Sequence, residues 1–125
     1  MSISIINIIN NADPDDDECV ILVVEEDINL GNYAIRDHTY DDDGDVSDIF
    51  PHYYEFPHKA VKKGEIIVLY TGTGKDGSYK NAEDTNVHAF YWGSDESIWN
   101  NSGDQAILLR IKYLQTYTIP DETEE

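Results

Sequence analysis

Cysteine is nearly absent from this chain, which carries Cys19 alone. A single cysteine excludes an internal disulfide and a cysteine-based zinc site within the chain. Cys19 lies in the apolar run from Cys19 to Val24, where cysteine usually behaves as a small hydrophobic residue. We therefore expect its side chain to be buried in a strand.

Long hydrophobic segments are also missing. No apolar run approaches the roughly 20 residues that a membrane-spanning helix needs. No basic segment followed by an apolar stretch opens the chain, so we find no signal peptide. The sequence predicts a soluble protein without a membrane span, and it leaves the compartment and the oligomeric state open.

Basic residues are scarce. The chain has 8 Lys plus Arg against 26 Asp plus Glu, a formal net charge of −18. Such a charge repels phosphate backbones and disfavours nucleic acid as a partner. It favours cationic partners or divalent metals, or it simply forms a solvated acidic surface. A protein partner is the expectation that remains.

The chain is rich in residue types that favour β-strands. Short segments rich in Ile, Val, Tyr and Thr alternate with Gly, Asn and Asp clusters, and no window keeps a helical period. The expected strands cover residues 3–9, 19–25, 28–35, 53–56, 66–70, 87–92, 98–109 (as a hairpin) and 114–119. About eight short strands predict an all-β protein, a sandwich or a barrel. We place one domain at residues 1–119 and an acidic tail at 120–125.

The expected hairpin is the most distinctive segment. Apolar residues flank a turn that contains Asn101, Gly103 and Asp104, residue types that adopt or stabilise tight turns. Nearby Tyr91, Trp92 and Trp99 are large aromatic side chains, for which packing in the core is the first expectation. These six residues are therefore candidates for structural roles.

Five segments together form a recognisable pattern: Asp15 to Glu18 before the Cys19 strand, Leu30 to Asp37, Val61 to Glu65, Tyr91-Trp92-Gly93, and Ile98 to Asp104. This pattern resembles the lamin tail domain family, whose fold is an immunoglobulin-like β-sandwich. The chain departs from the family pattern at Asn32 and Tyr33, where Gly and Trp are usual, and at Arg110 to Tyr113. The resemblance implies an interaction or accessory module rather than a particular ligand.

Two acidic clusters are candidate calcium sites. One consists of Asp15, Asp16, Asp17 and Glu18, and the other of Asp41, Asp43 and Asp45. The second is not an EF-hand, because with Asp41 at position 1 Gly44 comes two positions early and His52 stands where the bidentate Glu belongs. A calcium site of looser geometry, formed by several carboxylates, remains an alternative. A calcium-dependent extracellular binding module is therefore the first alternative function, and no other cofactor is expected.

Catalytic signals are weak. The four histidines lack the spacing of a helical zinc motif, and no serine-nucleophile motif is present. Carboxylate pairs are too numerous to select one, so a small enzyme using such a pair is the second alternative. Exposed tyrosines such as Tyr53 and Tyr79 leave carbohydrate binding open. The main prediction is a non-catalytic interaction module of unknown partner.

Overall fold

The described residues of the chain form β-sheets and one short 3-10 turn. The computed structural model describes residues 1–10, 18–38, 52–95, 97–99, 105–112 and 114–120. The largest sheet has five strands in the order β1 (Ile3–Ile9), β2 (Cys19–Val24), β7 (Ile66–Tyr70), β9 (Asn86–Tyr91) and β8 (Gly77–Lys80). Its neighbouring strands are antiparallel except β7 and β9, which run parallel. The all-β prediction is confirmed.

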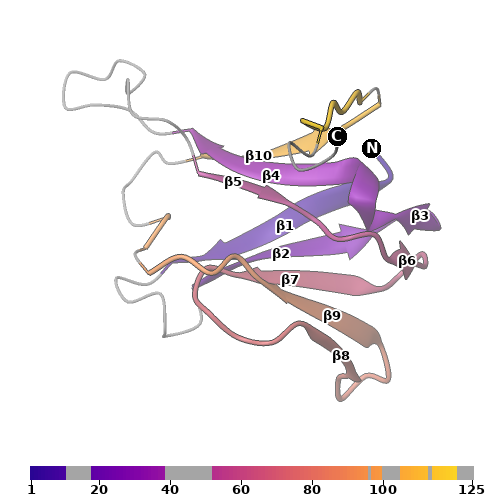
Figure 1. Ribbon diagram of the computed structural model, residues 1–125. Helices are drawn as coiled ribbons and strands as arrows, with labels where there is room; N and C mark the ends of the chain where they lie inside the picture. The colour runs from indigo at the N-terminus through magenta and orange to yellow at the C-terminus, as the bar shows by residue number, and fades with distance from the viewer. Residues whose placement is uncertain (11–17, 39–51, 96, 100–104, 113, 121–125) are drawn as a thin grey trace.

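A three-stranded sheet faces the five-stranded one (Figure 1). It contains β10 (Gln105–Arg110), β4 (Tyr33–His38) and β5 (Tyr53–Glu55) in that order. At one end β3 (Ile28–Asn29) pairs with β6 (Ala60–Val61), and the 3-10 turn η1 (Leu30–Asn32) leads into β4. The two larger sheets therefore form two layers.

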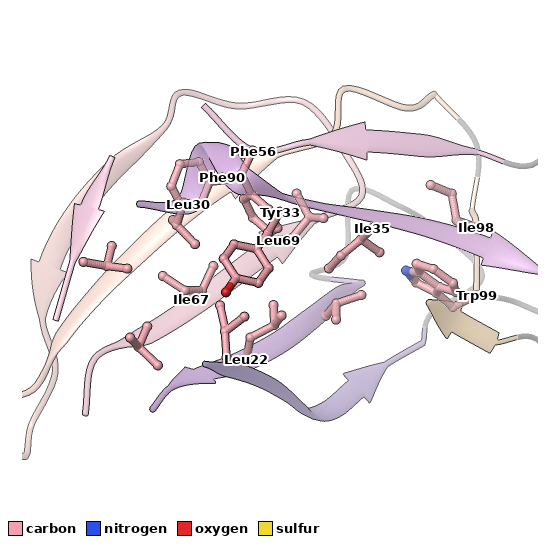
Figure 2. Close-up of a cluster of buried hydrophobic side chains, with 14 residues drawn as sticks. Leu22, Leu30, Tyr33, Ile35, Phe56, Ile67, Leu69, Phe90, Ile98 and Trp99 are labelled. Atoms are coloured by element: carbon pink, nitrogen blue, oxygen red, sulfur yellow. The ribbon is translucent and has the colours of Figure 1, made fainter. Parts of the chain in front are cut away.

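The hydrophobic core lies between these layers (Figure 2). Leu22, Ile67 and Leu69 come from the five-stranded sheet, and Tyr33 and Ile35 come from β4. All five are at most 2% exposed. Alternate residues of a strand point to opposite faces, so these positions fix which side of each strand is the inner side.

Several strands match the expected ranges. β1 and β7 have the predicted bounds, and the pairing of β1 with β2 shifts register between Ile5 and Asn7, as at a β-bulge. Cys19 is buried at 3% exposure, as predicted. The turn before β7 contains Gly64 at φ +91°, a backbone conformation that favours glycine.

The predicted hairpin is wrong. Ile98 and Trp99 form a bend and not a strand, and β10 pairs with β4 in the three-stranded sheet instead of with the segment before the turn. The backbone amides of Ile98 and Trp99 donate to the side chain of Glu18, which takes the place of a neighbouring strand.

The predicted strand at residues 114–119 is also wrong. Beyond Arg110, the part of the chain that the structure describes contains no strand. Leu114, Tyr117 and Ile119 are 76–84% exposed, so β-propensity here finds no partner strand to pair with. Conversely, β6 and β8 were not predicted. No helix within the described residues is long and apolar enough to cross a membrane.

Candidate functional site

Strands β2 and β7 of the five-stranded sheet carry apolar residues on both faces. Its side away from the three-stranded sheet, called the outer face below, is formed by alternate residues of the three central strands. These residues are Cys19, Ile21 and Val23 of β2, Ile66, Val68 and Tyr70 of β7, and Val87, Ala89 and Tyr91 of β9. None of them is charged.

A separate hydrophobic cluster occupies the outer face. Cys19, Val68 and Val87 are its buried members, and Ile21, Ile66 and Tyr70 pack around them half-buried. Every member of the cluster belongs to the five-stranded sheet, so none is shared with the core between the layers. A sheet face in contact with water usually carries polar side chains in alternation with the buried ones, and this face does not.

Two tyrosines close one end of the outer face. The rings of Tyr70 and Tyr91 stack with centroids 5.1 Å apart and an interplanar angle of 20°. The loop after β7 crosses next to them: a Cβ added at Gly74 would lie 2.4 Å from the Tyr91 ring. Asp76 Oδ1 accepts the Tyr91 backbone N–H at 3.0 Å. The loop thus holds this end of the face in a fixed position.

A second candidate is a hydrogen-bonded relay on the inner side of the same sheet, at its β8 edge. Ser78 Oγ lies 2.7 Å from His88 Nδ1, and His88 Nε2 lies 3.0 Å from Glu65 Oε1. His88 is 8% exposed, whereas Ser78 is exposed to solvent. The three residues come from β8, from β9 and from the turn before β7, so the relay depends on strand pairing and not on a local motif.

Glu65 is held as a carboxylate. Its burial alone would raise the pKa, but three hydrogen bonds outweigh that effect: from the Lys62 backbone N–H at 2.9 Å, from Asn86 Nδ2 at 2.8 Å and from His88. Together with the charge interaction with His88, they lower the Glu65 pKa from 4.5 to about 2.

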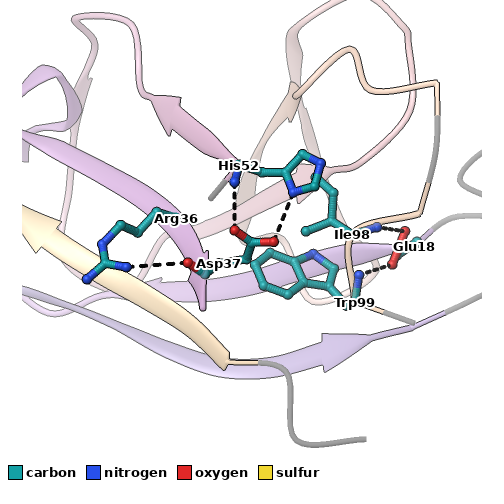
Figure 3. A network of polar contacts seen from close by, with 6 residues as sticks. All are labelled: Glu18, Arg36, Asp37, His52, Ile98 and Trp99. Carbon is teal, nitrogen blue, oxygen red and sulfur yellow. Dashed lines mark hydrogen bonds and ion pairs between the residues drawn. The ribbon is translucent and has the colours of Figure 1, made fainter. Parts of the chain in front are cut away.

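A third polar group is centred on Asp37 and His52 (Figure 3). Asp37, only 1% exposed, accepts the His52 backbone N–H at 2.6 Å and contacts His52 Nδ1 at 2.9 Å. The rings of His52 and Trp92 make a T-shaped contact with their centroids 6.4 Å apart, and Trp92 makes a second T-shaped contact with Trp99 at a centroid distance of 6.0 Å. This group joins β4, β5 and the segment after β9, which is a packing role. Elsewhere, His58 Nδ1 lies 3.3 Å from Asn29 Oδ1.

Glu18 has a structural role. It is fully buried, and its two carboxyl oxygens accept the backbone N–H groups of Trp99 at 2.7 Å and Ile98 at 3.3 Å. Both oxygens are therefore engaged by the protein, which argues against Glu18 as a calcium ligand in this arrangement.

The other calcium candidates lie outside the described residues, namely Asp15, Asp16, Asp17, Asp41, Asp43 and Asp45, as do the turn residues Asn101, Gly103 and Asp104. Within the described ranges, no three His, Cys, Asp or Glu side chains gather as a metal site would require. Calcium binding stays a prediction, and a thermal melt in EDTA and then in calcium, with magnesium as control, tests it.

The predicted structural aromatics occupy different environments. Trp99 is 3% exposed within the core, while Trp92 packs half-buried against that core and Tyr91 lies half-buried on the outer face. Trp99 Nε1 has no hydrogen-bond partner among the residues described.

The fold and these surfaces define a small all-β protein with two facing sheets, one of which has an uncharged outer face. Comparison of the sequence with protein-family models gives no match. A search of curated proteins likewise finds no significant match.

Proposed function

We propose that this chain is an interaction module, similar to lamin tail domains, that binds another protein through the outer face. The observation that carries the proposal is the absence of charge from the nine outer-face residues in a chain with a net charge of −18. The central residues of this face are buried and those around them half-buried, and an uncharged apolar face on an acidic protein is a candidate docking surface.

The charge of the chain indicates the kind of partner. An apolar face on a protein with a net charge of −18 is complementary to an apolar patch with lysine and arginine at its rim. A second copy of this chain would bring another −18 charge to the interface and is disfavoured by repulsion. We therefore infer a different protein with a basic rim as the partner.

The family resemblance supports the same function. The segments that resemble lamin tail domains include the Val61–Glu65 turn, which precedes β7, and Tyr91-Trp92-Gly93, which ends β9. Both segments border strands that form the outer face. An immunoglobulin-like arrangement of the strands is part of this proposal.

A synthetic probe tests the surface directly. The probe is a short amphipathic peptide of leucine and lysine, with all leucines on one helical face, and its binding is followed by fluorescence anisotropy. Ile21→Lys places a charge on the outer face opposite Val68 and should weaken binding about tenfold or more, which corresponds to at least about 1.4 kcal/mol. Ile21→Thr, which keeps a β-branched residue, should weaken binding less.

The matched control is Leu114→Lys, which adds the same charge at a residue that is 76% exposed and outside every strand. It should leave the affinity within about twofold. A scrambled peptide of equal charge should bind more weakly to the unmodified protein, and thermal melts check that each variant folds. Equal losses for Ile21→Lys and Leu114→Lys, or equal binding of the two peptides, would contradict the proposal and indicate charge attraction alone.

A further inference from the structure

The pairing of β8 with β9 brings Ser78 and His88 close together. The Asn81 N–H donates to the Thr85 carbonyl at 3.0 Å, and hydrogen-bonded pairs alternate along an antiparallel ladder. Ser78 and His88, three positions further along, therefore form a non-hydrogen-bonded pair, the type in which side chains lie closest. The observed 2.7 Å contact between Ser78 Oγ and His88 Nδ1 follows from this register.

The same register directs the Ser78 backbone. In a non-hydrogen-bonded pair the N–H and C=O groups point away from the partner strand. β8 is the last strand of its sheet, and among the residues described no strand pairs with its other side. The Ser78 N–H thus faces the open edge, where it can donate to an oxyanion, as the backbone N–H of the nucleophile does in serine hydrolases.

Glu65 fixes which nitrogen of His88 carries the proton. A carboxylate only accepts hydrogen bonds, so a neutral His88 places its proton on Nε2, toward Glu65 Oε1. Nδ1 then has a free lone pair and accepts the Ser78 hydroxyl hydrogen. This is the tautomer that a general base needs.

We propose that Ser78 is a reactive nucleophile that His88 activates as general base and Glu65 orients as a positioning residue. Ser78 Oγ attacks the carbonyl carbon of an ester while its proton passes to His88 Nδ1. The bond to the leaving alcohol then breaks, the alcohol takes the proton from His88, and Ser78 carries the acyl group. Water attacks this acyl-serine with His88 again accepting and returning the proton, which releases the carboxylic acid and restores Ser78.

The expected substrates are small esters without negative charge. Ser78 lies at an exposed sheet edge, so reactivity should require a good leaving group more than a shaped pocket. The net charge of −18 repels anionic esters and favours neutral or cationic ones. The main prediction from the sequence is a module without catalysis, and this relay is the arrangement that argues for an added activity.

Covalent labelling tests the proposal. The protein is incubated with a biotinylated fluorophosphonate, and peptide mapping by mass spectrometry locates the adduct, which we expect on Ser78. With p-nitrophenyl acetate we expect an initial burst of nitrophenolate that Ser78→Ala abolishes. His88→Asn should lower the rate of the burst about 100-fold, the contribution typical of general base catalysis.

Matched variants separate the relay from non-specific reactivity. Ser4→Ala removes another strand serine that donates to a glutamate, Glu25, but has no histidine partner, and it should change nothing. His58→Ala removes an exposed histidine and should also leave the burst intact, which excludes simple imidazole catalysis. Glu65→Gln should slow the burst while KM for the ester and binding of the leucine–lysine peptide stay unchanged. Labelling at other serines, or an unchanged burst in folded Ser78→Ala, would overturn the proposal without affecting the outer-face function.

Discussion

Replacing Glu18 tests the contact that fixes the segment after β9. Its side chain is fully buried and accepts two backbone N–H groups from residues about 80 positions away in the chain. Glu18→Ala leaves both amides without an acceptor and opens a cavity. Each unsatisfied buried amide costs about 1–3 kcal/mol, so we expect a loss of about 3–5 kcal/mol in the free energy of unfolding.

Glu18→Gln is the more specific variant. It keeps the shape and one acceptor oxygen, but its NH2 group faces a backbone N–H, so we expect a loss of about 1–3 kcal/mol. Urea denaturation followed by tryptophan fluorescence measures both changes as a lower midpoint with an unchanged m-value. The control is Asp27→Asn, because Asp27 accepts the Lys63 backbone N–H at an exposed position and should cost about 0.5 kcal/mol or less. If both Glu18 variants unfold like Asp27→Asn, the buried contact does not hold this segment.

Three further predictions concern stability. The Glu65 pKa of about 2 lies below its ordinary value, so the folding stability that ionised Glu65 contributes is complete above about pH 4.5 and is lost as pH falls toward 2. The urea midpoints of the unmodified protein and of Glu65→Gln should therefore converge in acid. Gly64→Ala should cost about 1–2 kcal/mol because φ is +91°, whereas Gly77→Ala, without a positive φ, should cost less; thermal melts decide, and equal costs would contradict the backbone argument. Asp37→Ala should destabilise the fold by about 1–3 kcal/mol and Asp37→Asn by less, since its amide oxygen still accepts an N–H, and the reverse order in urea denaturation would refute this account.

The sequence predicted the strands that carry their own apolar pattern. The bounds of β1 and β7 could be read directly because isoleucine and valine runs end at polar turns. β8 was missed because Gly77 to Lys80 lies at a sheet edge with every residue exposed, and it therefore shows no hydrophobic pattern. The strand predicted at 114–119 has β-propensity but pairs with no strand among the residues that the structure describes, and propensity alone does not form a sheet.

The candidate sites depend on pairing that a single sequence does not reveal. The continuous apolar runs of β2 and β7 do indicate strands buried on both faces, and this signal could have pointed to the outer face. The relay could not be found in this way, because Glu65, Ser78 and His88 meet only through the parallel pairing of β7 with β9 and the register of β8. Glu18 resembled part of an acidic loop, yet its contacts with Ile98 and Trp99 are tertiary.

The most direct test of the docking surface compares the two faces of the same strands. Methyl chemical shifts are recorded by NMR while the leucine–lysine peptide is added. We predict shifts for the outer-face residues Ile21, Val68 and Val87, with the inner residues Leu22 and Ile67 on the same strands unchanged. Shifts confined to other parts of the surface, or equal shifts on both faces, would contradict the proposal that this chain binds its partner through the outer face.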